Sequence, residues 1–452
     1  MDRPSRRRFI QTVGATSTLF AGCLEDSNET ELTEPGDAPE YEWSEPSWEP
    51  ADGVPTETDV ESTTVVSGLE IPWDLTFADD DAFVTERDGG VRRFDADSMR
   101  EDAQLEAADG EVILEATDLP DRSAPGEGGT LGLAVHPSYP DELALFVYYT
   151  VDTGEIENRV VRYDLETEDL EPILEGIPGA TTHNGGRITF GPQDDLWVTT
   201  GDAETPALTQ DPSSLAGAIL RVTTDGDPVS GNPNFGDESD SRTYSLGHRN
   251  PQGIDFCPDG VPFVAEHGPV ARDEISIVNP GGNYGWDVLR GGPDDPEYEA
   301  YGDGEYDEVT PPVLNTGPDK TWAPSGIDFY DSDTIPNWKN RLFVCGLTSE
   351  TLYAVSLSRD DEFSRTGNEA ESNGSETSNG DGSEETRDDG EWLDDRLTAT
   401  AQPLFGDEYG RLRHVEQGPD GTLYLLTSNR DGRADGEFPL ADDDRIVRLE
   451  PS

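Results

Sequence analysis

A histidine and an aspartate in one stretch of the chain are the first residues that could carry chemistry. His183 lies in THNGGRITF, and Asp202 follows nineteen residues later, after what reads as one pair of strands. Small, polar neighbours let a ligand approach the backbone there. A carboxylate beside an imidazole fixes the ring tautomer and supports it as a proton acceptor near neutral pH. We therefore favour a general base at His183, with a purely structural histidine as the alternative.

Arginines in two further motifs could bind an anion. Arg249 and Asn250 stand in LGHRNPQGIDF, before a proline that stiffens the turn, and a guanidinium offers a planar fork of donors to carboxylate or quinone oxygens. Arg411 and Arg413 stand two apart in YGRLRHV, so on a strand both face the same side. A loop-capping arginine at 249 and a solvated strand face at 411–413 are the alternatives.

The stretch EHGPVARDEISIVNPGGNYGW is rich in oxygen ligands of the kind that Ca²⁺ prefers. The candidates are the carbonyls around Gly268 and Pro269, the carboxylate of Glu274 and the carbonyl of Tyr284. In so acidic a chain the carboxylates could equally be solvated charges, and the glycine pair could be only a turn.

The elements that must position these residues are short strands joined in hairpins. The same pattern recurs in LTFADDDAFVTERDGGVRRF from Leu75, ITFGPQDDLWVTTGD from Ile188, IDFCPDGVPFVAEHG from Ile254 and VEQGPDGTLYLLTSNRDG from Val415. Each turn carries Pro, Asp or Gly, as tight hairpins require, and each second strand ends in a polar tip. Such repeats predict an all-β fold, a six-bladed β-propeller over 61–451 with long inter-strand loops, whose polar tips meet at one channel mouth. A pair of β-sandwiches is the alternative.

The N-terminal segments and one internal stretch differ from this pattern. SRRRFIQ, a modest apolar run and LFAGC predict a twin-arginine signal peptide over 1–23, and Cys23 after FAG resembles a lipobox. Residues 24–60 predict an acidic tether rich in Pro and Glu, and 358–391 predict a disordered acidic insertion between strands. We therefore expect an exported protein, extracellular and held at the cell surface by lipid at Cys23.

The charge is −68, from 98 acidic and 30 basic residues. Such a surface repels itself in dilute buffer, whereas at molar salt the Debye length falls to about 3 Å and the repulsion is screened. We therefore expect a protein from a high-salt organism, and with no basic stripe we expect no nucleic-acid partner. Cys257 and Cys345 have no neighbours typical of a metal cluster and are expected to be buried thiols.

Taken together, these motifs resemble the soluble pyrroloquinoline quinone (PQQ)-dependent aldose sugar dehydrogenases, the glucose/sorbosone dehydrogenase family. The resemblance runs from Gly68 to Leu449 and rests on eight motifs in the family's order: GLEIPWDLTF, GEGGTLGLAVHP, HNGGRITFGP, GHRNPQGIDF, EHGPVARDE, GGNYGW, APSGIDFY and RLRHV. Each motif is weak alone, but eight in order are specific. The resemblance implies a six-bladed propeller with PQQ over the channel mouth.

The resemblance also implies roles for residues of this chain. His183 matches the general base and Asp202 the carboxylate that orients it, while Arg249 and Asn250 match residues that grip the quinone and the reacting oxygen. The other implied cofactor contacts are Glu127, His267, Thr321, Arg411 and Arg413. The implied calcium ligands are Gly268 and Pro269 for a cofactor-linked ion, and Glu274 and Tyr284 for a structural one.

Four positions depart from the best-known glucose dehydrogenase of the family. Glu127 and His267 stand where that enzyme has glutamine, Thr182 where it has aspartate, and Thr348 where it has a cofactor-binding lysine. The departures resemble the aldose branch of the family. Losing the lysine removes one cation from the expected PQQ site.

The predicted function is oxidation of aldoses at C1 to lactones, with His183 as general base, hydride transfer to PQQ, Ca²⁺ as second cofactor and an external electron acceptor. One alternative is a non-catalytic propeller that binds carbohydrate or a partner at the cell surface. The other is a calcium-dependent lactonase on the same architecture.

Overall fold

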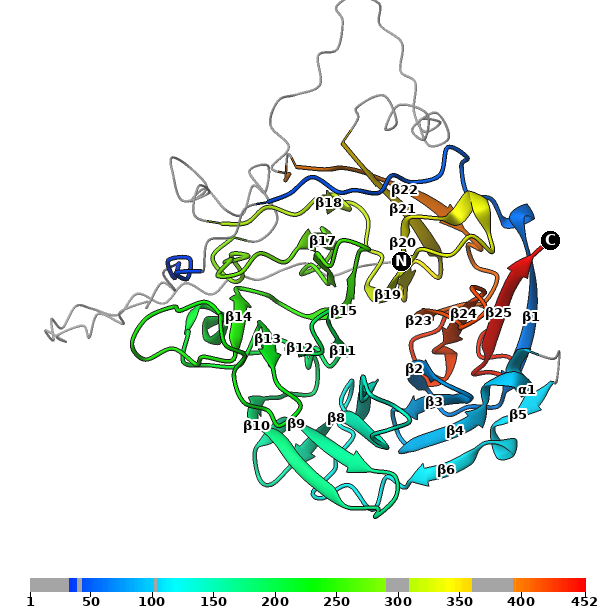
Figure 1. Cartoon of the computed structure of the whole chain (residues 1–452), viewed down its shortest axis with the longest axis horizontal. Coiled ribbons are helices and arrows are strands. Elements are labelled where there is room, and N and C mark those ends of the chain that lie inside the picture. Colours follow the sequence, from blue (N-terminus) through cyan, green and yellow to red (C-terminus); the bar gives the residue numbers. More distant parts are fainter. Residues whose placement is uncertain (1–31, 39–42, 101–103, 290–308, 360–392, 395) are drawn as a thin grey trace, which may run out of the picture.

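The computed structural model describes residues 32–38, 43–100, 104–289, 309–359, 393–394 and 396–452, which form a six-bladed β-propeller (Figure 1). The fold predicted from the hairpin repeats is therefore confirmed. The expected signal peptide, and all of the expected insertion except Ser358 and Arg359, lie outside the described residues.

The first three blades are four-stranded sheets whose strands follow in chain order, except that β5 leaves blade 1 and joins blade 6. Blade 1 contains β2 (Pro72–Ala78), β3 (Asp81–Glu86), β4 (Val91–Asp95) and β6 (Glu111–Leu114). Blade 2 contains β7 (Thr130–Val135), β8 (Ala144–Asp152), β9 (Ile156–Asp164) and β10 (Leu170–Pro178). Blade 3 contains β11 (Ile188–Phe190), β12 (Leu196–Thr199), β13 (Ala218–Val222) and β14 (Thr243–Leu246).

The last three blades include the one that closes the ring. Blade 4 contains β15 (Pro251–Phe256), β16 (Pro262–Glu266), β17 (Glu274–Ile277) and β18 (Leu314–Asn315). Blade 5 contains β19 (Pro324–Tyr330), β20 (Arg341–Gly346), β21 (Leu352–Ser358) and β22 (Thr398–Leu404). Blade 6 joins β23 (Leu412–Gln417), β24 (Leu423–Thr427) and β25 (Ile446–Pro451) to β1 (Val60–Ser67) and β5 (Leu105–Glu106), with the short helix α1 (Ala96–Arg100) beside it.

Closure of the ring comes from the two ends of the propeller sequence. β1 pairs antiparallel with β25, so the first and last strands of the domain share one sheet. The innermost strands β2, β7, β11, β15, β19 and β23 each contact the next one around the channel, and β23 contacts β2. Full closure leaves few free sheet edges, which stabilises an all-β fold.

The tight turns of three hairpins determine at which end of the ring the candidate site lies. In the hairpins β15–β16 and β23–β24, Gly260 and Gly421 adopt φ of +79° and +77°, where a side chain would be strained. In the hairpin β11–β12, Asp194 takes φ 61°, which a short polar side chain tolerates better than most. Because these hairpins all turn at the same end, the residues before each first strand and after each second strand gather at the other end.

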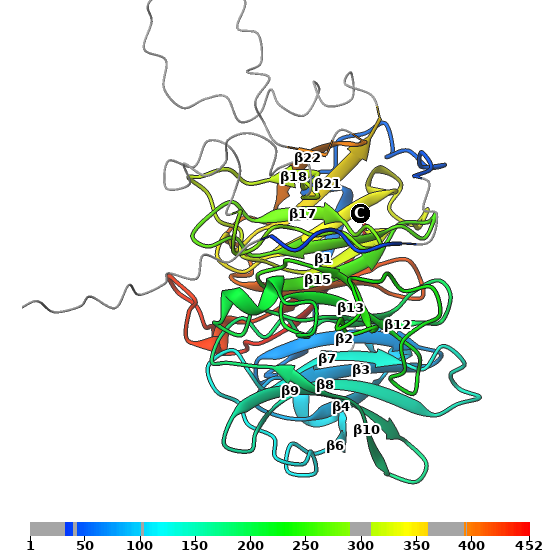
Figure 2. The same cartoon turned by 90° about the vertical axis from the view of Figure 1, so that its left-hand side faces the viewer.

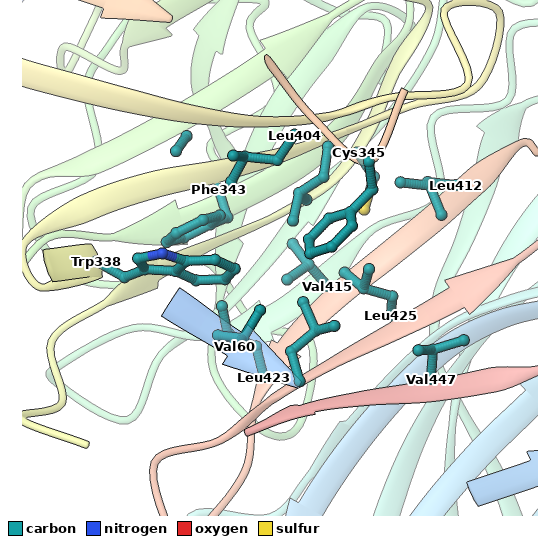
Figure 3. Packing of buried hydrophobic residues seen from close by; sticks show 14 of the residues in the cluster. Val60, Trp338, Phe343, Cys345, Leu404, Leu412, Val415, Leu423, Leu425 and Val447 are labelled. Atoms are coloured by element: carbon teal, nitrogen blue, oxygen red, sulfur yellow. The ribbon is translucent and has the colours of Figure 1, made fainter. Parts of the chain in front are cut away.

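Apolar side chains fill the space between neighbouring blades. Between blades 5 and 6, Phe343, Leu412, Val415 and Leu425 are fully buried in one cluster (Figure 3). At about 25 cal/mol per Å² of buried apolar surface, side chains of this size each stabilise the fold by about 1.5–3 kcal/mol. Cys345 belongs to this cluster and Cys257 to the cluster between blades 4 and 5; both are buried free thiols, as predicted.

The described parts of the segment expected to be a tether lie against the propeller. We call residues 32–38 and 43–53 the strap. In Figure 1 residues 43–53 follow the outer strands β18 and β22, whereas residues 32–38, the darkest blue segment, lie nearer β14 and run along the side of the disc beside β17 in Figure 2. Trp48 is buried, with its ring centroid 4.7 Å from that of Phe329. Arg341 donates to the carbonyl of Ala51 at 2.8 Å. A buried tryptophan and satisfied backbone carbonyls hold this acidic segment in place.

Among the described residues, no helix has the length and apolar character needed to cross a bilayer.

Candidate active site

His183 and Asp202 meet at the end of blade 3, on the loops that flank the hairpin β11–β12. Nδ1 of His183 lies 2.8 Å from Oδ1 of Asp202, as the hairpin return predicts. The Asp202 carboxylate is 1% exposed, and its Oδ2 accepts a 2.8 Å hydrogen bond from the indole Nε1–H of Trp286. A buried carboxylate held on both oxygens fixes the histidine as the tautomer with hydrogen on Nδ1. The lone pair of the ring is then on Nε2.

Arg249 occupies the other side of the imidazole. Its Nη2 lies 3.0 Å from Nε2 of His183, and with hydrogen on Nδ1 the guanidinium donates and the imidazole accepts. The guanidinium carbon lies 5.3 Å from the centre of the Trp286 ring, and Nη1 donates to the carbonyl of His267 at 3.3 Å. Burial lowers the pKa of Arg249, and Asp202 and Glu266 oppose that fall. The Nε2 lone pair is thus accessible to a small donor that displaces Arg249.

Asn250 and His267 extend the site toward blade 4. Asn250 Oδ1 accepts the backbone N–H of Gly185 at 3.1 Å, which fixes the loop after His183. The amide Nδ2 of Asn250 lies 3.3 Å from Nδ1 of His267. Burial lowers the pKa of His267 to about 4, so this imidazole is neutral at pH 7. Its Nε2 is buried without a hydrogen-bond partner among the described residues.

Glu127 connects His183 to a distant loop. Its Oε2 accepts the backbone N–H of His183 at 3.3 Å, and its Oε1 forms an ion pair with Arg433, 306 residues further along the chain. Burial acts to raise the pKa of Glu127, but the hydrogen bond and charge of Arg433 outweigh it and the pKa is lowered. Glu127 is therefore an anion that spans from blade 2 to blade 6.

Glu127 and His267 line a cavity of about 230 Å³, whereas His183, Arg249 and Asn250 are not among its lining residues. Its lining is rich in charge, and includes Arg87, Glu127, His267, Thr348, Glu350, Arg411, Arg413, Asp431 and Arg433. Arg411 pairs with Asp431 at 2.9 Å. Arg413 is 5% exposed, and among the described residues it donates only to neutral oxygens, of Gln252 at 2.8 Å and Ser325 at 3.2 Å. Burial, opposed in part by Asp431, lowers its pKa to about 9.

This donor set fits a planar polycarboxylate such as PQQ. Arg413 is a buried cation without a carboxylate partner in its hydrogen bonds, and its Nε is unpartnered among the described residues. Buried charges of this kind are normally paired. Nε of Arg249 and Nε2 of His267 are likewise without partners there. An anionic ligand with several acceptor oxygens would satisfy such groups.

The three threonines singled out from the sequence lie in different surroundings. Thr182 donates its hydroxyl to Glu204 at 2.9 Å. Thr348 lines the cavity, at the position where the resemblance implies a lysine elsewhere in the family. Thr321 donates its hydroxyl to Asp273 at 2.9 Å, and is not among the residues that line the cavity. A direct contact of Thr321 with a cofactor stays a prediction.

The four expected calcium ligands surround one small cavity of about 30 Å³. Gly268, Pro269, Glu274 and Tyr284 all line it, together with Glu266. Burial and the charge of Glu266 raise the pKa of Glu274 to about 8. The described residues contain no group of three or more His, Cys, Asp or Glu side chains placed to hold a metal ion. Backbone carbonyls would therefore have to supply part of the coordination, as Ca²⁺ accepts.

Three contacts of the site were not anticipated from the sequence. Trp286 ends the GGNYGW motif, but nothing in that motif indicates that its indole would bond Asp202. Gln252 follows the rigid turn at Pro251, and its partner Arg413 lies 161 residues away. Arg433 stands in a loop with no motif of its own. Only the ring of blades brings these residues together.

The comparisons with known proteins agree with this fold and site. The model of the Glucose / Sorbosone dehydrogenase family matches residues 69–435, and the chain belongs to that family. It is 28% identical over 383 residues to the aldose sugar dehydrogenase YliI of Escherichia coli, covering 80% of this chain and 89% of that one. It resembles the PQQ-bound aldose sugar dehydrogenase of Streptomyces coelicolor at 31% identity and a TM-score of 0.62, covering 88% and 100% of the two chains. A quinoprotein glucose dehydrogenase B of Acinetobacter calcoaceticus is 32% identical over 206 residues, 39% of this chain and 43% of that one.

Proposed function

We propose that the protein is a PQQ- and Ca²⁺-dependent dehydrogenase that oxidises aldoses at C1 to lactones and passes the electrons to an external acceptor. The observation that carries this proposal is the juxtaposition of two features. The bond from Nδ1 to Asp202 leaves the lone pair of His183 on Nε2. The backbone of His183 is bonded to Glu127, which lines a cavity that also contains Arg413, a buried arginine with only neutral hydrogen-bond partners among the described residues. The similarity to PQQ-bound aldose sugar dehydrogenase supports the cofactor assignment.

The proton transfer follows from the geometry of His183. A sugar hydroxyl at C1 would replace Nη2 of Arg249, now 3.0 Å from Nε2, and give its proton to that nitrogen. Asp202 stabilises the imidazolium that forms, because its carboxylate is already bonded to Nδ1 at 2.8 Å. Arg249, displaced from Nε2, can donate to the sugar oxygen from which the proton left. When bound, PQQ would accept the hydride from C1.

Ion pairs and hydrogen bonds with charged side chains would hold the cofactor, in addition to the shape of the cavity. Arg411 and Arg413 are the residues we expect to bind its carboxylates, with Asn250, His267 and Arg249 as neutral and charged donors at the other side. Gly268, Pro269, Glu274 and Tyr284 would hold Ca²⁺. Export by the twin-arginine route and a lipid anchor at Cys23 are part of this proposal, and those residues lie outside the described part of the chain.

The test is a reconstitution at high salt. Purified protein in about 2 M KCl receives PQQ with and without CaCl₂, and dye reduction is followed across a panel of aldoses. We expect sugar-dependent reduction only with PQQ, and none from the His183→Ala variant. Absence of reduction with every aldose, in protein shown to be folded and to contain PQQ, would refute the proposal.

A further inference from the structure

The strap is bonded to the loops that support the active site. The backbone N–H of Thr33 donates to Oε1 of Gln210 at 2.9 Å, and the Thr33 hydroxyl donates to the Gln210 carbonyl. The carbonyl of Thr33 accepts from Nδ2 of Asn283 at 2.7 Å. Gln210 and Asn283 are both nearly inaccessible to solvent, at 6% and 1% exposure, so these bonds form inside the protein.

Further backbone contacts hold the strap at the same place. Gly36 N–H donates to the carbonyl of Gly281 at 2.8 Å, and Asp37 exchanges two backbone bonds with Asn234. A side chain on Gly281 would come within 2.3 Å of the Gly36 carbonyl, so the glycine permits this approach. The strap thus ties together three loops of blades 3 and 4.

From Gln210, a chain of bonds leads to the catalytic histidine. Gln210, the last residue of the 3₁₀ helix Pro206–Gln210, donates from Nε2 to the Trp286 carbonyl at 2.7 Å. The Trp286 indole donates to Asp202 at 2.8 Å. Asp202 in turn bonds Nδ1 of His183 at 2.8 Å.

The direction of the Gln210 amide depends on the strap. Of the two ends of the Gln210 amide only Oε1 can accept a hydrogen bond, so the N–H of Thr33 selects the orientation in which Oε1 faces the strap and Nε2 faces Trp286. The flipped amide would set two donors against each other at Thr33 and two acceptors at Trp286. Asn283 supports the same orientation, since it also donates to Oε1 of Gln210, at 2.8 Å.

We infer that the strap is a positioning element of the active site: Thr33 fixes Gln210, Gln210 fixes Trp286, and Trp286 holds the carboxylate that orients His183. This inference rests on the proposed function, because the reaction it supports is the proton transfer to His183. Thr33, Gln210 and Trp286 act through Asp202 and need not touch the substrate. The segment before the propeller is then part of the enzyme's catalytic support.

The test compares two positions on the strap in the full-length protein. Thr33→Pro removes the N–H and the hydroxyl that bond Gln210. Ser47→Pro is the matched control, because it removes an N–H and a hydroxyl that bond Asp259, where no bond leads to Asp202. Thr33→Val and Ser47→Ala are milder versions that remove only the hydroxyl.

Two readouts distinguish positioning from general stability. The first is the Trp286 indole resonance in protein labelled with ¹⁵N-tryptophan, assigned with Trp286→Phe. The second is the division of the kinetic effect between kcat and KM. For Thr33→Pro we expect a shifted or broadened indole resonance and a kcat lower by about 5- to 20-fold, with KM within twofold, because small errors of alignment weaken catalysis strongly. Ser47→Pro should change neither.

The possible results test the positioning role of the strap separately from the proposed function. An unchanged indole resonance in Thr33→Pro would overturn the inference whatever the activity, and so would a shifted resonance with unchanged kcat in active enzyme. An equal loss of kcat in Thr33→Pro and Ser47→Pro would reduce the strap to a stabilising segment and also overturn it. If the wild-type protein contains PQQ but oxidises no aldose, the proposed function fails. The claim that the strap supports catalysis then fails with it. The indole resonance of Thr33→Pro would still show whether Thr33 positions Trp286.

Discussion

Replacing Arg413 with methionine should make the protein more stable and its cofactor site weaker. The guanidinium is 5% exposed, and the partners of its hydrogen bonds are the neutral Gln252 and Ser325. Methionine is shorter than arginine, but its unbranched side chain fills the inner part of the same space and needs no hydrogen-bond partner. The substitution therefore removes a cation that the fold buries without a bonded anion, and that we assign to the carboxylates of PQQ.

The size of the effect follows from the lowered pKa of Arg413. Burial lowers the pKa of Arg413 to about 9, and the ordinary pKa of a guanidinium is more than three units higher. At 1.36 kcal/mol for each pKa unit, the buried charge costs the folded state about 4 kcal/mol. Loss of the bonds to Gln252 and Ser325 costs about 1–2 kcal/mol in return. We expect the free energy of unfolding of Arg413→Met to rise by about 2–3 kcal/mol.

Cofactor binding should change in the opposite direction. A hydrogen bond to a charged group is worth about 1.5–3 kcal/mol, so the dissociation constant for PQQ should rise about 10- to 100-fold. Arg341→Met is the matched control. Arg341 is also buried, with a pKa lowered to about 10, but it donates five hydrogen bonds, to the Ser356 hydroxyl and to four backbone carbonyls, and it does not line the cavity. Because the loss of five bonds at about 1 kcal/mol each outweighs the removal of the buried charge, Arg341→Met should be less stable than wild type and should bind PQQ with unchanged affinity.

Urea unfolding of the apo-protein gives the stability, and a fluorescence titration with PQQ gives the affinity, both at the same fixed ionic strength. A second prediction of the same reasoning is pH dependence. The buried cation lowers the free energy of unfolding by its full amount below about pH 9. This destabilisation decreases as the pH rises through 9, because Arg413 loses its proton in the folded state before it does so in the unfolded chain. PQQ affinity should therefore fall above about pH 9. An Arg413→Met variant that is less stable than wild type and binds PQQ equally well would refute the argument.

Four further predictions concern other parts of the molecule. His183→Ala should lower kcat by about 10²- to 10⁴-fold, with the PQQ dissociation constant within threefold of wild type; unchanged turnover would remove His183 from the mechanism. Glu127→Gln removes an anion from the cavity and frees Arg433, so PQQ should bind about fivefold more tightly at low salt and with a smaller gain at 2 M KCl, as titrations at both salts would show. Trp48→Ala, which empties the site where the strap is anchored beside Phe329, should lower the free energy of unfolding by about 3–5 kcal/mol in denaturant melts, and a loss below about 1 kcal/mol would contradict the burial of this side chain. Cys257 and Cys345 should be silent to a thiol reagent in the native protein and both react after unfolding, because both are buried and burial raises the pKa of each thiol.

Local patterns were enough to predict the blades and several members of the site. The hairpins at Gly260 and Gly421 follow from turn residues that sit beside the strands they join. The pairing of His183 with Asp202 follows from the same logic, because one hairpin separates them. The strap was expected to be part of an acidic tether over 24–60, because an acidic, proline-rich composition does not indicate that a single tryptophan packs in a buried site beside Phe329.

The sequence by itself determined the fold class, the family and the residue types of the candidate site, because strand periodicity, turn chemistry and ordered motifs act over a few residues. Only the tertiary structure decided which groups meet. Trp286 reaches Asp202 across 84 residues, Asn283 reaches Thr33 across 250, and Arg433 reaches Glu127 across 306. These contacts depend on ring closure and on the paths of loops, which are set by packing between blades and leave no periodic signal in the chain.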